Sequence, residues 1–362
     1  MSNRTLNFNA GPATLPLEVL QKIKEEMLDY DGCGMSVMEM SHRSAEFDYI
    51  NNQTIKLFKE LLGLNDNYQI LFLGGGASTQ FATVPLNFLH SGKTAAYVDT
   101  GAWSSKAIKE ANLIGNVDVV ASSKKENFSY IPSLANLNLS PDTAYLHLTS
   151  NNTIFGTQIH DFPDTGEIPL VCDMSSDIAC KKLDYNKFSL IYAGAQKNMG
   201  PAGVTIVIIR DDFLEKATDQ IPIISRYKTH VEKNSLYNTP PAFAIYTVML
   251  VLEWIKNKGG LKAIEKNNLT KKDKIYQMID NNQDFYKGAV KQDSRSWMNV
   301  TLRLPSEDLD KKFISEAKSA GMVGLKGHRS VGGVRISIYN AQTLENVETL
   351  VQFMDDFKKN NS

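Results

Sequence analysis

Hydrophobic residues recur at two different spacings along the first two thirds of the chain, and these spacings alternate. Residues 44–63 place an apolar stripe on one helical face, and Gly63 is a suitable end for that helix. The stripe consists of Phe47, Ile50, Thr54, Phe58 and Leu61. The apolar run at residues 68–76 then predicts a short buried strand, and residues 77–90 return to a helical pattern.

The alternation continues beyond this first unit. Residues 104–115 predict another helix, and strands are predicted in TAAYVDT, TAYLHLTSNN, IPLVCDMSSD, FSLIYAGAQK and GVTIVIIR. Strands that alternate with helices indicate an α/β fold with a largely parallel sheet, covered by helices on both faces.

The pattern of hydrophobic and polar residues changes after a long apolar helix that follows NTPP. The prolines of this motif suit the first turn of that helix. Residues 261–282 predict a charged surface helix. SWMNVTLRL and GGVRISIYN alternate as half-buried strands do, and two amphipathic helices are predicted in residues 310–321 and 343–359. We therefore predict a large domain, residues 16–256, and a smaller α+β domain formed by residues 1–15 and 257–362.

The composition of the chain disfavours several classes of function. The chain has 362 residues, 42% of them hydrophobic, and a net charge of −1, so a nucleic-acid footprint is not expected. The three cysteines, Cys33, Cys172 and Cys180, lack metal-ligand spacing and fit a reducing compartment. We see no signal-peptide pattern, and the most apolar helix is too short for a membrane span. We expect a cytoplasmic protein that binds no metal and does not associate with a membrane.

A glycine-rich turn, FLGGGASTQ, lies between a predicted strand and a predicted helix. Backbone N–H groups at such a helix start form a natural phosphate seat, to which Ser78 and Thr79 could add hydroxyl donors. A tight turn that simply needs glycine is an equal alternative. A dinucleotide fingerprint is broken, because Thr79 stands where a third glycine or alanine belongs, although Asp99 could imitate the ribose-binding acid.

Two opposite charges end consecutive predicted strands. Asp173 closes one strand and Lys197 follows the next, in AGAQKNMGPAG, so both should lie at the sheet edge where α/β proteins bind ligands. Lys197 is expected in a loop that joins two strands as a hairpin. A buried ion pair, or a capping role for Asp173, is the alternative.

Pyridoxal phosphate would use these three features together. It needs a lysine for covalent attachment, an acid facing its ring nitrogen and a phosphate cradle. Trp103, in DTGAWSS, could stack on the ring, although core packing is the more usual fate of a tryptophan.

A basic segment, GLKGHRSVGGVRISIYN, supplies candidate anion-binding residues. Arg335 lies on the strand face opposite Val334 and Ile336, and arginine suits bidentate carboxylate recognition. His328 and Arg329, on a glycine-flanked loop, suit a phosphate dianion. A solvated basic turn is the alternative.

These motifs together resemble the phosphoserine aminotransferase family, which belongs to the class V, fold type I pyridoxal-phosphate enzymes. The resemblance covers nearly the whole chain. It is carried by NFNAGPATLP, MEMSHRS, FLGGGASTQF, TGAW, SNNTIFGTQ, CDMSSD, GAQKNMGPAG, NTPPAF and GLKGHRSVGG, in this order.

The resemblance implies a role for individual residues. Lys197 corresponds to the lysine that carries the cofactor and Asp173 to the partner of the ring nitrogen. The other implied cofactor-binding residues are Ala77, Ser78, Trp103, Thr153 and Gln196, with Asn238 and Thr239 reaching in from the neighbouring subunit of a homodimer. The implied substrate-binding residues are Arg335 for the α-carboxylate, His328 and Arg329 for the phosphate, and Arg43 for the distal carboxylate of glutamate or the phosphate.

The implied reaction is transamination between L-glutamate and 3-phosphohydroxypyruvate, giving 2-oxoglutarate and O-phospho-L-serine for serine biosynthesis. A related step on a phosphorylated hydroxythreonine in pyridoxine biosynthesis is also implied. Three alternatives remain open: a cysteine desulfurase, disfavoured because all cysteines precede Lys197; a nicotinamide dehydrogenase, disfavoured by the broken fingerprint; and a scaffold without catalysis, disfavoured by Lys197 and Asp173.

Overall fold

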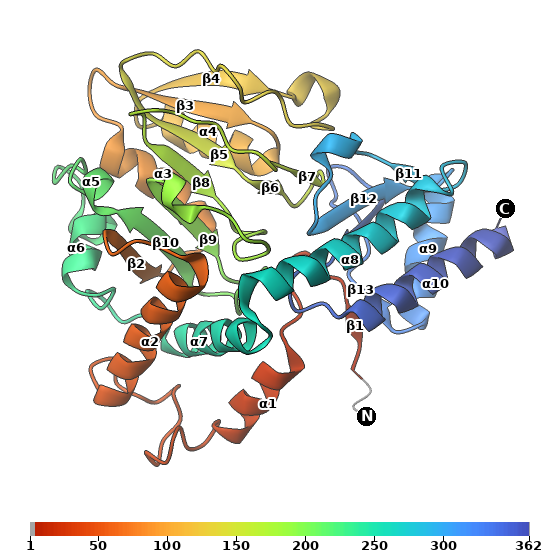
Figure 1. The fold of residues 1–362 in the computed structure, drawn as a ribbon, viewed down its shortest axis with the longest axis horizontal. Helices are drawn as coiled ribbons and strands as arrows, with labels where there is room; N and C mark the ends of the chain where they lie inside the picture. The colour runs from red at the N-terminus through yellow and green to blue at the C-terminus, as the bar shows by residue number, and fades with distance from the viewer. Residues whose placement is uncertain (1–3, 362) are drawn as a thin grey trace.

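The computed structural model describes residues 4–361 as a large helix-covered sheet with a smaller sheet beside it (Figure 1). Residues 1–3 and 362, which the predicted domain boundaries include, lie outside the described residues. The chain order of elements follows the predicted alternation of strands and helices.

Seven strands form the large sheet, in the order β2-β10-β9-β8-β5-β3-β4. Neighbouring strands are parallel from β9 to β4, whereas β10 runs antiparallel to both β9 and β2. The strands are β2 (Tyr68–Leu73), β3 (Thr94–Asp99), β4 (Asn116–Ser122), β5 (Thr143–Thr149), β8 (Leu170–Asp173), β9 (Leu190–Gly194) and β10 (Thr205–Arg210). A short hairpin, β6 (Asn151–Asn152) and β7 (Thr157–Gln158), follows β5. The predicted largely parallel sheet is confirmed.

Helices cover both faces of this sheet because strand residues alternate between two cores. Ile70 and Phe72 of β2 belong to one hydrophobic cluster, whereas Leu71 and Leu73 belong to another. The first cluster includes α1 (Leu17–Glu25), α2 (Ala45–Leu62) and α7 (Ala242–Asn257). The second includes α3 (Ala77–Phe88), α4 (Ala102–Asn112), α5 (Asp211–Leu214) and α6 (Tyr227–Glu232).

The predicted helix at residues 44–63 is confirmed, together with its ends. The Ser44 hydroxyl accepts a hydrogen bond from the Phe47 N–H at 3.2 Å, which satisfies one free donor of the first turn of α2. Gly63 ends the helix at φ 64°, in the left-handed region that glycine adopts without strain.

Strand β4 is a structural feature that the sequence analysis does not predict. It forms the edge of the sheet and pairs with β3, but most of its residues are exposed or only half-buried. An edge strand with little buried surface lacks the apolar run that marked the central strands.

The smaller region surrounds a three-stranded antiparallel sheet and has a hydrophobic cluster of its own. β1 adds to it from the N-terminus by pairing with β13. The elements are β1 (Leu6–Asn7), α8 (Gly260–Asp280), β11 (Lys287–Gly288), β12 (Asn299–Arg303), α9 (Glu307–Ser319), β13 (Met322–Val323), β14 (Val334–Ser337) and α10 (Leu344–Asn361). The separate cluster supports the predicted two-domain division, which we retain as a proposal.

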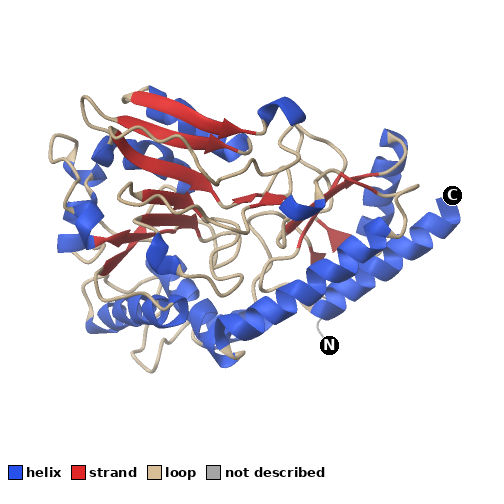
Figure 2. Ribbon diagram, turned by 45° about the horizontal axis from the view of Figure 1, so that its top comes forward, coloured by secondary structure: helices blue, strands red, loops and turns tan. Residues whose placement is uncertain are grey.

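Helix α8 differs from the expectation of a charged surface helix. It runs beside α10 (Figure 2), and its inner face buries polar side chains, with Asn268 and Lys271 both 0% exposed. Many residues of α8 are charged, yet one face of the helix is fully packed.

The longest apolar helix behaves as predicted, since most residues of α7 are buried. No helix in the described part of the chain is long and apolar enough to cross a membrane.

Candidate functional site

Lys197 lies in the loop between β9 and β10, at the edge where the parallel strands end. The two strands pair antiparallel, with Gly194 opposite Thr205, so the predicted strand–loop–strand hairpin is confirmed. Strand β8, parallel to β9, ends at Asp173 on the same edge. The topology therefore brings Lys197 and Asp173 to neighbouring strand ends.

The Lys197 amine lies among polar and aromatic groups. Its Nζ donates a hydrogen bond to Thr153 Oγ1 at 2.7 Å and lies 5.3 Å from the Trp103 ring centre. Although part of its surface is open to solvent, burial lowers the pKa of Lys197 to about 8, with Asp173 opposing the shift. An amine with such a pKa is partly neutral near physiological pH and is therefore nucleophilic.

Asp173 is only 5% exposed and is tied to its own loop. Its Oδ1 accepts hydrogen bonds from the Ser175 N–H at 2.9 Å and the Ser175 hydroxyl at 2.6 Å. Burial raises the pKa of Asp173, while Lys197 and Ser175 act in the opposite direction. Among the ion pairs of the described residues none joins Asp173 to Lys197, so the capping alternative is realised and the simple ion pair is not.

Arg335 approaches Lys197 from the smaller region. It lies on β14, opposite Thr301 of β12, and its Nη1 donates to the Thr153 carbonyl at 3.3 Å. Its Nε is buried without a hydrogen-bond partner among the described residues. Thr153 therefore connects the two cations, one through its hydroxyl and one through its carbonyl.

The glycine-rich turn leads directly into α3, which begins at Ala77. Gly75 and Gly76 have φ of 92° and 74°, so glycine is required there by the turn, as the structural alternative proposed. Ser78 is exposed, whereas the Thr79 hydroxyl donates to the Gly75 carbonyl at 2.7 Å. The expectation that Thr79 offers a free donor is therefore wrong, while Ala77 and Ser78 keep their place at a helix start.

Gln196 lies next to Lys197, and its side chain folds back over the end of β9. A Cβ at Gly194 would lie 2.6 Å from Gln196 Oε1, so the Gln196 side chain occupies the space beside Gly194. The Gln196 carbonyl accepts from the Ala13 N–H at 2.9 Å, which ties the N-terminal segment to the lysine loop.

His328 lies near Arg335 and Arg329 on a glycine-flanked loop. Burial, followed by Arg335, Arg329 and Lys106, lowers the pKa of His328, and its Nδ1 is 2.7 Å from the Ser330 hydroxyl. The positive charges of Arg335, Arg329 and Lys106 therefore all act on His328.

Lys106 is a further residue near the site, and it was not predicted from the sequence. Its Nζ lies 4.4 Å from the Trp103 ring centre, and its charge acts on His328. Its spacing of three residues from Trp103 on α4 was the available signal, because residues three apart are neighbours on a helix.

Arg43, Asn238 and Thr239 are exposed, and among the described residues no hydrogen bond joins any of them to Lys197. The Asn238 amide donates to the adjacent Thr239 carbonyl at 3.3 Å. In the part of the chain that the structure describes, no group of three or more metal-ligating side chains is found.

Asp99 is used differently from a ribose-binding acid. Its Oδ1 accepts from the Ser104 and Ser105 hydroxyls at 2.9 Å and 2.7 Å, at the start of α4. This local role weakens the dinucleotide alternative.

Comparisons with known proteins agree with this geometry. The family model for class V aminotransferases matches residues 5–350. Phosphoserine aminotransferases from Desulfatibacillum aliphaticivorans and Bacillus subtilis are 56% and 54% identical, with at least 99% of each chain covered.

Solved structures give the same result. The phosphoserine aminotransferase of Bacillus circulans subsp. alkalophilus superposes with a TM-score of 0.98 at 53% identity, covering 100% of both chains. The PLP-bound enzyme of Trichomonas vaginalis gives 0.92 at 39% identity, over 97% of this chain and 100% of that one. By sequence and by structure, the chain belongs to the phosphoserine aminotransferases within the class V aminotransferase family.

Proposed function

We propose that this aminotransferase binds pyridoxal phosphate at Lys197 and transfers the amino group of L-glutamate to 3-phosphohydroxypyruvate. The observation that carries the proposal is the placement of a Lys197 amine of lowered pKa between Thr153, Trp103 and Asp173. The products would be 2-oxoglutarate and O-phospho-L-serine.

The residues present fit this cofactor. Trp103 Nε1 and Arg335 Nε are buried polar atoms without partners among the described residues, so the site has unused donors. Asp173 would face the ring nitrogen of the cofactor, and its Oδ2 is available because both hydrogen bonds from Ser175 end on Oδ1. The start of α3 at Ala77 and Ser78, with Gln196, would hold the phosphate.

When bound, pyridoxal phosphate supplies an electron-withdrawing ring that makes the Cα–H bond of an amino acid easier to break. The Lys197 amine would accept that proton from Cα of glutamate and return one to Cα of the product amino acid in the second half-reaction. Thr153 holds the lysine through its hydroxyl while the amine is in place.

Substrate recognition would come from the basic side chains. Arg335 would take the α-carboxylate, since its guanidinium lies close to Lys197 through Thr153. His328 and Arg329 would bind the substrate phosphate, with Arg43 contributing to the same pocket. Both half-reactions would then use one pocket for two different anions.

We further propose a homodimer in which Asn238 and Thr239 complete the partner's cofactor site. Their exposure supports this, as do the exposed apolar side chains of Met38 and Ile224, which line hollows together with Thr239 and Asn238 respectively. The pyridoxine-pathway activity and the cytoplasmic location stay predictions.

The desulfurase alternative loses further support from the cysteines. Cys172 and Cys180 are buried, and burial raises the pKa of both thiols, which disfavours the nucleophilic thiolate. Cys33 precedes α2 and is half-buried.

Borohydride reduction followed by peptide mapping tests the proposal. Reduction should fix a pyridoxyl group on Lys197, and the parent enzyme should show ping-pong kinetics with the two substrates. A pyridoxyl group on any other lysine, or an obligatory ternary complex, would overturn the assignment.

A further inference from the structure

Lys271 is a buried lysine to which the reaction assigns no role. It lies on the inner face of α8, with 0% of its surface exposed. Its Nζ donates to the carbonyls of Ile338, Tyr339 and Gln342 at 3.0, 2.7 and 3.0 Å. An ammonium group has three N–H donors, so all three donors of Lys271 form hydrogen bonds to the turn at residues 338–342.

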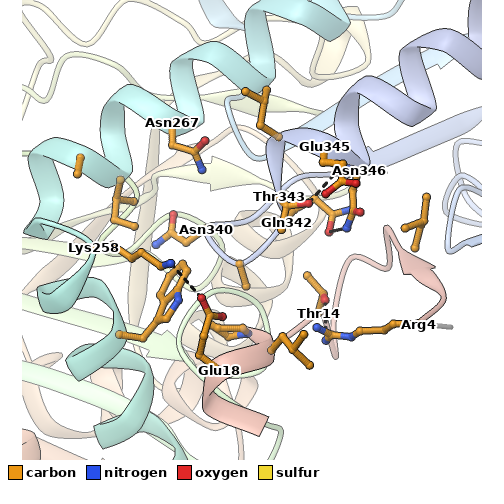
Figure 3. Close-up of a pocket in the computed structure, with 18 of the residues that line it drawn as sticks. Arg4, Thr14, Glu18, Lys258, Asn267, Asn340, Gln342, Thr343, Glu345 and Asn346 are labelled. Carbon is orange, nitrogen blue, oxygen red and sulfur yellow. Dashed lines mark hydrogen bonds and ion pairs between the residues drawn. The ribbon is translucent and has the colours of Figure 1, made fainter. Parts of the chain in front are cut away.

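One side of this turn faces a cavity, although its residues are almost wholly buried. Asn340 and Gln342 border a cavity of about 610 Å³ between the N-terminal segment, the corner joining α7 to α8, and the start of α10 (Figure 3). The turn is also held by the Ile338 N–H, which donates to the Met298 carbonyl at 2.8 Å, and by the Tyr339 hydroxyl, which donates to the Ala10 carbonyl at 2.7 Å. Lys271 adds to these contacts by binding three carbonyls of the turn at once.

The turn connects directly to the loops that carry the site. The Asn340 N–H donates to Asn198 Oδ1 at 2.9 Å, and Asn198 is the residue after Lys197. The Asn340 amide donates to the Ala179 carbonyl at 3.0 Å, in the loop that follows Asp173. On its other flank the turn continues β14, which carries Arg335.

Asn268 reinforces the same arrangement from one turn earlier on α8. Its amide donates to Asn340 Oδ1 and to the Cys180 carbonyl, both at 2.8 Å. The segments that follow Asp173, Lys197 and Arg335 thus meet at one turn. Helix α8 binds this turn through hydrogen bonds from Asn268 and Lys271.

We propose that Lys271 is a positioning residue, which fixes the turn at 338–342 and thereby sets Arg335 relative to Lys197. This inference rests on the roles proposed above for Arg335 and Lys197. A purely structural role would lower the fraction of folded enzyme, and hence kcat per chain, without changing KM. A positioning role changes the KM of the folded enzyme for carboxylate substrates.

The first test compares Lys271→Met with Lys274→Met, a control on the same helix whose exposed ion pair with Glu348 measures 3.0 Å. Lys271→Met should raise KM for glutamate about 10-fold, because small displacements of a substrate-positioning group are costly. The control should leave KM unchanged. A parent-like KM for Lys271→Met, at a reduced or unchanged kcat, would overturn the proposal.

The second test is a double-mutant cycle with Arg335→Lys. If Lys271 acts through Arg335, Lys271→Met should raise KM for glutamate far less in the Arg335→Lys background than in the parent. Fully additive effects would overturn the proposal. If Arg335→Lys alone left this KM unchanged, the carboxylate role of Arg335 would fail instead, so the two failures are distinguishable.

The third test needs no activity. In the cofactor-free protein, hydrogen exchange should accelerate in Lys271→Met over residues 338–342, while α9 keeps the exchange rate of the parent. Uniform acceleration, or none, would overturn the proposal. Should Lys271→Met fail to fold, Lys271→Gln replaces it in all three tests, since its shorter side chain keeps two N–H donors but cannot serve three carbonyls.

Discussion

The site residues fall into two groups with different surroundings. The inner group, Asp173, Thr153, Lys197 and Arg335, is wholly or partly buried, and hydrogen bonds hold each side chain. The outer group, Arg43, Ser78, Asn238, Thr239 and Arg329, is exposed, and in the described chain no hydrogen bond or ion pair joins it to the inner group.

This difference separates two tasks of the protein. The inner group is pre-organised within one chain, so it can shift pKa values and move protons at low reorganisation cost. In the described chain no hydrogen bond or ion pair fixes the outer group to the inner group. This is expected of residues that bind an anion or contact a second subunit. We therefore expect changes to the inner group to act on chemistry with any substrate. Changes to the outer group should act on selectivity or, for Asn238 and Thr239, on the cofactor site of the partner subunit.

The largest expected effect comes from removing the inner carboxylate charge. Asp173→Asn keeps an oxygen acceptor for Ser175 but removes the negative charge from the proposed ring nitrogen. The single-turnover rate with glutamate should fall about 100-fold, in the range for loss of one electrostatic contact in a buried site.

Asp99→Asn is the matched control for this variant. Asp99 is also a buried acid at a strand end, but its carboxylate caps the start of α4. Its substitution should leave the single-turnover rate close to that of the parent. Equal losses in both variants would remove the special role of Asp173.

An outer cation should act on one substrate more than the other. Arg329→Ala should reduce kcat/KM for the phosphorylated keto acid by about 10-fold or more, because charge-assisted hydrogen bonds to the phosphate are lost. The loss with glutamate should be smaller. Lys326→Ala, an exposed change on the same loop, is the control, and equal losses for both substrates in Arg329→Ala would contradict a phosphate-specific role.

Mixing two inactive variants tests whether the outer group serves the neighbouring chain. Lys197→Ala and an Asn238→Ala/Thr239→Ala double variant should each be nearly inactive. After subunit exchange, half of the dimers should be hybrids with one intact site, which restores about a quarter of the parent activity. No recovery, despite hybrids detected by native mass spectrometry, would place Asn238 and Thr239 in their own chain's site.

The inner pair was predictable from the sequence because a general rule locates it. Strands of a parallel sheet end at one edge, so Asp173 and Lys197 could be placed together from strand ends alone. The helix at residues 44–63 was similarly predictable, since its caps and apolar stripe are local signals.

Features that depend on distant contacts were not predictable in this way. The burial of Lys271 follows from β14 and the turn after it, more than 60 residues away along the chain. The Asn340–Asn198 contact likewise joins segments 142 residues apart. Strand β4 was missed because polar residues interrupt its short apolar segments and its exposed edge lacks the long apolar run of the central strands.

The smallest expected effect is on the pH dependence of stability in the cofactor-free protein. The pKa of Lys197 is lowered to about 8, whereas an unfolded lysine titrates near 10.4. Between these values the unfolded chain binds more protons, so Lys197 makes stability rise with pH from about 8 to 10 and adds no slope below 8. The buried thiols Cys172 and Cys180, whose pKa values burial raises, oppose this slope above about 8.5. The difference between the parent and Lys197→Met isolates one lysine, because all other groups are common to both proteins. Urea unfolding at pH 7.5, 8.5 and 9.5 measures this difference in stability. The parent should gain stability relative to Lys197→Met at each step above pH 8. Parallel curves would mean that the Lys197 amine is not held in the desolvated state on which the inner group depends.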